Sequence, residues 1–127
     1  MLTKPTARYI YLATPHTDPD KRVEAARETE ANKIAAFLAE LGLRFFSPIS
    51  HSAPLIRAGA DLEHAEWLLL DQPLLANAGA LIVVCFPGWQ DSAGIKQEIE
   101  FMRTIGRPIF FLSPDYGTDT VFTTPRQ

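Results

Sequence analysis

The sequence predicts an α/β protein built on an open, mainly parallel sheet of four to five strands, with helices on both faces. Short apolar runs alternate with segments whose apolar residues recur every three or four positions, which is typical of strands alternating with helices. Residues 79–86 are apolar throughout, as expected of a parallel strand covered on both faces. Of the 127 residues, 46% are hydrophobic and 21% charged, which indicates one globular domain spanning 1–127.

The first strand is expected at RYIYLA, residues 8–13, where a Thr-Pro pair closes it. A helix is expected to begin at Asp18-Pro19, with the proline in its first turn. It should end at Gly42, because glycine suits the position just past a helix. The second strand is expected at LRFFSPI, residues 43–49.

Residues 50–60 are interpreted as a loop because they are rich in serine and proline. Residues 60–78 have a helical composition, although Pro73 is expected to kink that helix or split it in two. After the buried strand 79–86, a helix is expected over about 92–105.

The fourth strand is expected at RPIFFL, residues 107–112, and TVFTT, residues 120–124, is a candidate edge strand. In open α/β sheets, ligands bind at the carboxyl ends of the strands, near the point where the strand order changes direction. Three loops leave those ends, namely 14–18, 47–60 and 86–92. We therefore expect the chemistry of the protein to lie there.

The composition excludes several classes of protein. A formal net charge of −3 argues against a domain that grips phosphate backbones, so no nucleic acid polymer is expected as a partner. The single cysteine, Cys85, excludes an internal disulfide and a multi-cysteine zinc site, and fits a reducing cytoplasm. No signal peptide and no membrane span are expected. Without metal-ligand spacing or a glycine-rich phosphate motif, we expect neither a metal nor a cofactor.

The helix over about 92–105 places a carboxylate beside the core. At about 100° per residue, Ile95, Ile99 and Met102 share the arc that faces the sheet. Glu98 lies about 60° from that arc, and it leans toward the space that a side chain at Gly94 would fill. A carboxylate below such a gap suits a nucleophile or a general base. The alternative is a helix-surface acid and a glycine that is merely tolerated.

Several short motifs, taken in their order and spacing, make this sequence similar to a known family. These motifs are YLATP, FSPISHS, D-x3-L-x-N-A before the buried strand, D-S-x-G-x3-E-I and GRPI, and they cover residues 9–112. Together they resemble the nucleoside 2-deoxyribosyltransferase-like superfamily. The stretches SPISHS and P-G-W-x-D-S-x-G make the chain most similar to a bacterial and phage family of unassigned function within it.

The resemblance implies a flavodoxin-like, three-layer α/β/α fold and attack by a glutamate on the anomeric carbon of a deoxynucleoside. The matching nucleophile is Glu98. Asp71 matches the acid that handles the nucleobase proton, and Tyr11 matches a tyrosine that contacts the nucleophile. Thr14 and Pro15 lie in the first substrate loop.

The chain also departs from the superfamily. An acid usually stands six residues before the nucleophile, where this chain has Ser92, and Asp91 lies one position earlier. Gly94 matches the superfamily, but Ile95 follows it in place of threonine or serine. Asp91 remains a second candidate acid. We expect Asp91 and Ser92 to cap the helix, where they could also contact a ligand. These differences leave the base-binding contacts, and hence the substrate, open.

Other polar and aromatic residues have two interpretations each. His16 and His51 are candidate substrate contacts in the loops, or hydrogen-bonded structural residues. Trp89 could stack on a nucleobase or cover the core. Arg22 and Arg27 could reach a 5′-phosphate, although a solvated helical face is the preferred interpretation.

The favoured function is an enzyme of N-glycosidic bonds, either a 2-deoxyribosyltransferase or a hydrolase, acting on a nucleoside or nucleotide. The alternatives are a non-catalytic nucleotide-binding or sensing module on the same fold, and a purely structural assembly protein. The resemblance also implies a homo-oligomer, a dimer or tetramer. The apolar WLLL and PLLA stretch around Trp67 is its candidate interface.

Overall fold

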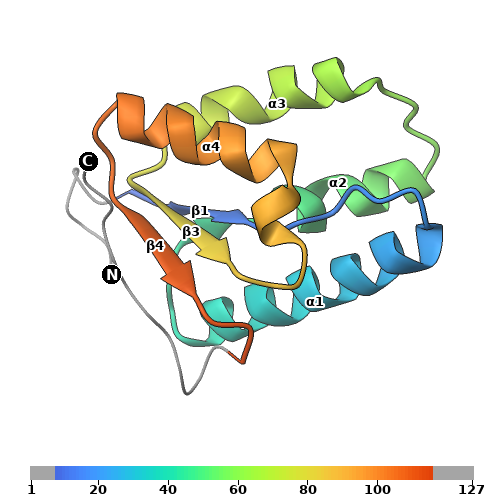
Figure 1. Ribbon diagram of the computed structural model, residues 1–127, viewed down its shortest axis with the longest axis horizontal. Helices are drawn as coiled ribbons and strands as arrows, with labels where there is room; N and C mark the ends of the chain where they lie inside the picture. The colour runs from blue at the N-terminus through green and yellow to red at the C-terminus, as the bar shows by residue number, and fades with distance from the viewer. Residues whose placement is uncertain (1–7, 116–127) are drawn as a thin grey trace.

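The computed structural model describes residues 8–115, which form a four-stranded, all-parallel sheet with four α-helices and one short 3-10 helix (Figure 1). The strands are β1 (Ile10–Ala13), β2 (Phe45–Phe46), β3 (Ala80–Val84) and β4 (Ile109–Leu112). Their order in the sheet is β2-β1-β3-β4. The predicted α/β class with a parallel sheet is confirmed. The candidate strand at 120–124 lies outside the described residues.

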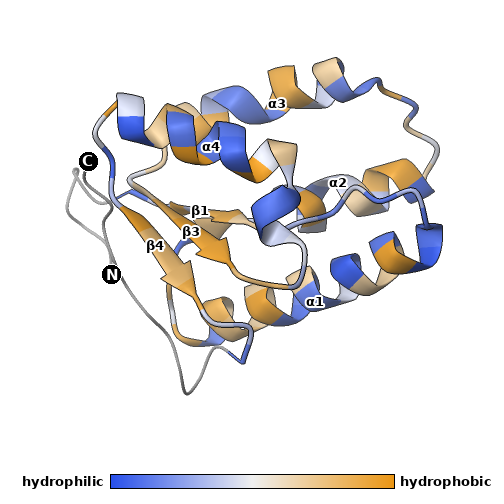
Figure 2. Cartoon of the chain, in the orientation of Figure 1, coloured by the Kyte–Doolittle hydropathy of each residue, from blue (hydrophilic) through white to orange (hydrophobic). Residues whose placement is uncertain are grey.

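The helices form layers on the two faces of the sheet (Figure 1). They are α1 (Lys21–Glu40), α2 (Pro48–Arg57), α3 (His64–Ala76), α4 (Ala93–Thr104) and the 3-10 helix η1 (Trp89–Asp91). Neighbouring strand residues point to opposite faces, so Leu12 packs with Ile34 of α1 while Tyr11 packs with Ile95 of α4. The strands are largely hydrophobic, whereas the helices on either side carry both hydrophobic and hydrophilic turns (Figure 2).

The strand order changes direction between β1 and β3. From β1 the chain crosses through α1 to β2 on one side, and from β3 it crosses through α4 to β4 on the other. The loops after these two strands therefore diverge, although the strands pair in register up to Ala13 and Val83. This is the switch point at which ligands bind in doubly wound sheets.

The start of α1 differs from the prediction. The helix begins at Lys21, and Pro19 lies outside it rather than in its first turn. Asp20 is the N-cap, because its side chain accepts a hydrogen bond from the backbone N–H of Arg22 at 2.9 Å. A capping aspartate thus outweighs the preference of proline for a first helical turn.

The prediction of a loop at 50–60 is wrong, because most of that stretch belongs to α2. Ser47 caps the helix by accepting a hydrogen bond from the N–H of Ser50 at 3.3 Å, and Pro48 occupies the first position, where no N–H is needed. Serine and proline therefore mark the start of a helix here. The preceding strand is correspondingly short, with only Phe45–Phe46 paired to β1.

Helix α3 is continuous from His64 to Ala76, so Pro73 does not split it. Proline removes the hydrogen bond to the carbonyl four residues earlier, which is that of Leu69, a residue 72% exposed to solvent. The leucines at 68, 69 and 70 are all exposed and belong to the stretch expected to form an interface. The expected homo-oligomer stays a prediction. No helix among residues 8–115 has the length and apolar character to cross a membrane.

Candidate active site

Three polar side chains from different elements meet beside the central strands. The Tyr11 hydroxyl, on β1, donates a hydrogen bond to the Glu98 carboxylate, on α4. The charge of Asp71, on α3, acts on both of these groups. Tyr11 is buried, while Glu98 and Asp71 are half-buried. The structure therefore brings together the residues that the resemblance matched to nucleophile, acid and tyrosine.

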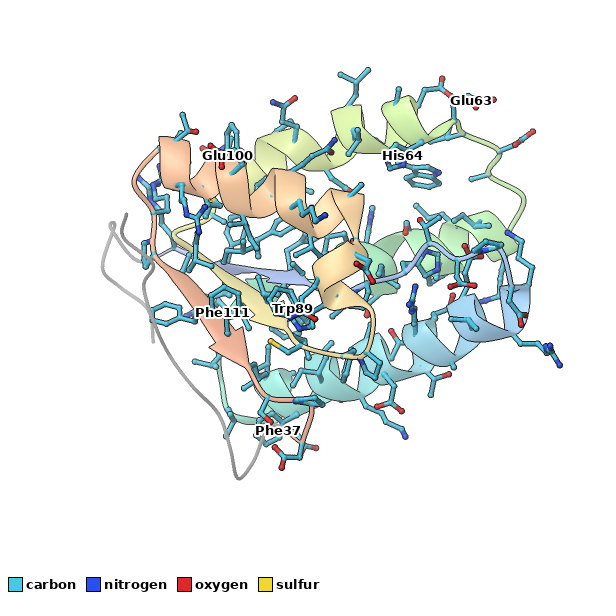
Figure 3. The ribbon with its side chains drawn as sticks, viewed as in Figure 1. Phe37, Glu63, His64, Trp89, Glu100 and Phe111 are labelled. Carbon is cyan, nitrogen blue, oxygen red and sulfur yellow. The ribbon has the colours of Figure 1, made fainter. Side chains whose placement is uncertain are left out.

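The local structure of α4 explains the position of Glu98. Ser92 caps the helix by accepting a hydrogen bond from the N–H of Ile95 at 3.2 Å. Ile95 and Met102 are buried against the sheet, which leaves Glu98 at the border of the core. Glu100, two positions later, is exposed on the outer surface of α4 (Figure 3). The angular arrangement agrees with the helical periodicity of the sequence.

The environment of Glu98 favours its protonated form. Burial raises the pKa of Glu98 from its ordinary value of 4.5 to about 8, and the charge of Asp71 adds to this effect. The hydrogen bond from Tyr11 acts in the opposite direction but does not offset the burial. At neutral pH the free protein therefore holds a proton at this carboxyl.

The same surroundings also raise the pKa values of Asp71 and Tyr11. Burial raises the pKa of Asp71, an effect opposed in part by the charge of His51. Burial, followed by the charges of Glu98 and Asp71, raises the pKa of Tyr11, so its hydroxyl remains a neutral donor. Two adjacent carboxyls with raised pKa values can share one proton, as an acid–base pair requires.

His51 joins this cluster from α2 rather than from a loop. Its ring lies 5.5 Å from the ring of Phe46, which is itself 5.9 Å from the ring of Tyr11. His51 is exposed and acts electrostatically on Asp71.

The space at Gly94 is open. A Cβ atom built there meets only the Ser92 hydroxyl oxygen, at 3.9 Å, which is an ordinary van der Waals contact. The described part of the protein would therefore accept a larger residue at this position. The fold itself therefore does not require glycine here.

The structure gives other candidates different positions. Asp91 is exposed at the end of η1, and its expected capping role is wrong because Ser92 alone caps α4. Trp89 packs on Phe111 with ring centroids 5.6 Å apart, so it covers the core (Figure 3). Pro15 is fully buried, and Thr14 is half-buried beside it.

The interpretation of Arg27 as part of a solvated face is wrong. Its side chain is only 19% exposed, and it donates hydrogen bonds to the carbonyls of His16 and Thr17. Arg22, in contrast, is 92% exposed and pairs with Asp20. No sequence motif marks a side chain that binds a loop in this way. The only signal is that Arg27 lies one helical turn after Glu24, whose carboxylate also binds this loop.

A metal centre has no evident ligands in the described part of the chain. Among residues 8–115, no three histidine, cysteine, aspartate or glutamate side chains are grouped so that they could hold a metal ion.

The fold corresponds to a known class of structure, the three-layer α/β/α fold. The chain is similar to the solved structure of a 2-deoxyribosyltransferase from the psychrotolerant bacterium Bacillus psychrosaccharolyticus, described as a biocatalyst for the synthesis of antiviral and antitumoral nucleosides. The TM-score is 0.61 and the identity 22%, and the match covers 84% of this chain and 72% of that one. This likeness shows the fold.

The family follows from the sequence comparison. Residues 8–114 match the family described as Domain of unknown function (DUF1937), and the chain belongs to that family. No curated protein sequence matches the chain significantly.

The burial of Glu98 has a measurable effect on stability. Since its pKa is raised from 4.5 to about 8, the folded state keeps a proton that the unfolded chain loses. The free energy of unfolding therefore falls as the pH rises through that window. We expect Glu98→Gln to be more stable than the wild type by roughly 2–4 kcal/mol above about pH 8, and nearly equal to it below about pH 4.5.

Chemical denaturation of both proteins across this pH range measures the difference. Glu100→Gln is the matched control, because Glu100 is exposed on the same helix and its removal should leave the pH dependence unchanged. An equal stability of Glu98→Gln and wild type at every pH would contradict the buried, protonated state of Glu98.

Proposed function

We propose that this protein cleaves or transfers the N-glycosidic bond of a nucleoside or nucleotide, with Glu98 as the nucleophile and Asp71 as the proton donor to the leaving base. The observation that carries the proposal is the contact of the half-buried Glu98 with Tyr11, next to a second half-buried carboxyl, Asp71. Perturbed carboxyl pairs of this kind are enriched at catalytic sites. The likeness in fold to a 2-deoxyribosyltransferase supports the same class of substrate.

The reaction needs one ionised and one protonated carboxyl. When the base leaves, positive charge develops on the sugar ring and negative charge develops on the base. The Glu98 carboxylate attacks the anomeric carbon and forms an ester bond to the sugar while the carbon–nitrogen bond breaks. Asp71 donates its proton to the departing nitrogen. A second base or a water molecule then displaces Glu98 from the sugar, and the acceptor's proton returns to Asp71.

The environment supplies one proton to the carboxyl pair, although the free protein holds it on Glu98 rather than on Asp71. Burial raises the pKa of both carboxyls, which favours a pair that holds one proton near neutral pH. In the free protein that proton resides on Glu98, so the substrate complex must place it on Asp71. The Tyr11 hydroxyl then stabilises the carboxylate of Glu98 by its hydrogen bond.

The substrate is proposed to occupy the open space at Gly94 and to meet His51 at the exposed side of the cluster. Ser92 is committed to its helix cap, and Trp89 is packed on Phe111. A base-stacking role for Trp89 therefore loses support. Asp91 remains a weaker candidate acid than Asp71, because the charge acting on Glu98 is that of Asp71.

The first test is turnover of a panel of nucleosides, deoxynucleosides and their 5′-monophosphates, with and without an acceptor base. We expect release or exchange of the base by the wild type, and a loss of at least about a thousandfold in Glu98→Gln, because the nucleophile is removed. Glu100→Gln, with an exposed carboxyl on the same helix, should retain full activity.

Chromatography of the free base measures this reaction. Ligand-induced thermal stabilisation without any product, retained in Glu98→Gln, would contradict catalysis and favour the non-catalytic nucleotide-binding module. If no compound in the panel gives thermal stabilisation or turnover, the result contradicts both the enzymatic function and the nucleotide-binding function.

The shared proton predicts a particular pH profile. The reactive singly protonated pair disappears at low pH, and also above about pH 8, where Glu98 loses its proton. We expect kcat/KM of the wild type to be bell-shaped with a falling limb near this value. In Asp71→Asn, kcat should be much lower and kcat/KM should rise with pH, because only the ionisation of Glu98 then matters. A wild-type profile that rises through pH 8 would contradict the role of Asp71.

The open space at Gly94 predicts that a larger residue there raises KM without lowering the stability of the fold. Gly94→Ala should fold with unchanged or higher stability, by up to about 1 kcal/mol, because alanine favours a helix more than glycine does. The added methyl group enters the proposed substrate space, so KM should rise about tenfold or more. Thermal denaturation and steady-state kinetics measure the two effects. An unchanged KM would place the substrate elsewhere.

A further inference from the structure

One arginine of α1 connects the two loops that leave the switch point. The loops after β1 and β3 start side by side, since Ala13 and Val83 are paired. The Arg27 guanidinium donates hydrogen bonds to the carbonyls of Thr17 at 3.0 Å and His16 at 3.4 Å in the first loop. It also donates to the carbonyl of Pro87 at 3.5 Å in the second loop.

The packing around Arg27 is close. Its side chain is 19% exposed, and a carboxylate oxygen of Asp18 lies 3.9 Å from the guanidinium. Gly88, with a φ of +94°, approaches so closely that a Cβ atom would stand 2.5 Å from the Arg27 Nη2 atom. A planar fork with five donors spans carbonyls of two loops more widely than the compact ammonium of a lysine, which has three donors on one nitrogen.

The first loop has a second attachment to α1. The Glu24 carboxylate accepts a hydrogen bond from the backbone N–H of Asp18 at 3.0 Å. The Asp18 side chain in turn accepts one from the N–H of Asp20 at 2.9 Å. Glu24 thus anchors the first loop to α1, whereas Arg27, from the same helix, also joins that loop to the loop after β3.

We propose that Arg27 is a positioning residue of the candidate active site, which holds the loops after β1 and β3 together and thereby sets where α4 begins. Pro87 and Gly88 lead directly into η1 and the cap of α4, so a displaced loop displaces Glu98 relative to Tyr11. This inference rests on the proposed function. Displacements of about 1 Å in a catalytic arrangement can reduce a rate about 100-fold.

The contacts of Arg27 argue against a direct role in binding a phosphate. Its guanidinium is already bound to three backbone carbonyls and faces the carboxylate of Asp18. A phosphate would have to displace these partners and meet the charge of Asp18. The role therefore operates through the backbone of the loops rather than through contact with substrate.

The test compares Arg27→Gln and Arg27→Lys with the matched control Arg22→Gln, whose side chain is 92% exposed on the same helix. We expect kcat/KM to fall about 10- to 100-fold in Arg27→Gln, by the same factor for nucleosides and for 5′-monophosphates. Arg27→Lys should recover only part of the loss. Amide hydrogen exchange should accelerate at residues 14–18 and 86–89 in the Arg27 variants, and Arg22→Gln should match the wild type in both measurements.

The outcomes separate this inference from the proposed function. If the wild type turns over no member of the panel, the proposed function fails, and the exchange rates alone decide whether Arg27 holds the loops. Unchanged exchange and unchanged kinetics in Arg27→Gln would overturn the inference, as would a loss confined to 5′-monophosphates, which would indicate a direct phosphate contact. If Arg27→Gln does not fold, Arg27→Lys carries the same comparison, because it keeps the charge and the aliphatic stem.

Discussion

The parallel pairing of β1 with β3 is the constraint on which the rest of the structure depends. These strands are neighbours in the sheet but far apart in the chain, and the connections from them leave in opposite directions. Because of that divergence, the loops after the two strands cannot pack fully on one another. Helices from both halves of the chain then deliver polar side chains to the same region, and Arg27 joins the two loops.

The carboxyl cluster is costly for the fold. An ionised carboxylate that loses contact with water is destabilising unless other groups replace its hydration, and here the Tyr11 hydroxyl replaces only part of it. The protein therefore holds Glu98 protonated when no ligand is bound. A leucine or methionine at this border position would suit the core better.

Local sequence signals predicted much of the architecture because they depend on a few neighbouring residues. The apolar run of β3 and the three-to-four spacing of α1 and α4 identify these elements without any knowledge of the tertiary fold. The same local signals failed for α2, because serine followed by proline can begin a helix as well as form a loop. Only the extended backbone of Ser47 and its bond to Ser50 distinguish the two.

The sequence by itself determined the alternation of the four strands with α1, α3 and α4, though not α2. It also determined the placement of Glu98 at the border of the core, since helical periodicity is a property of the local backbone. Tertiary structure alone decided that Asp71 lies beside Glu98 and that His51 reaches the same cluster from a helix. It also decided that Arg27 binds two loops rather than solvent. The physical reason is that these contacts join residues from separate elements, whose distances follow from the packing of helices on the sheet and from no pattern within one segment.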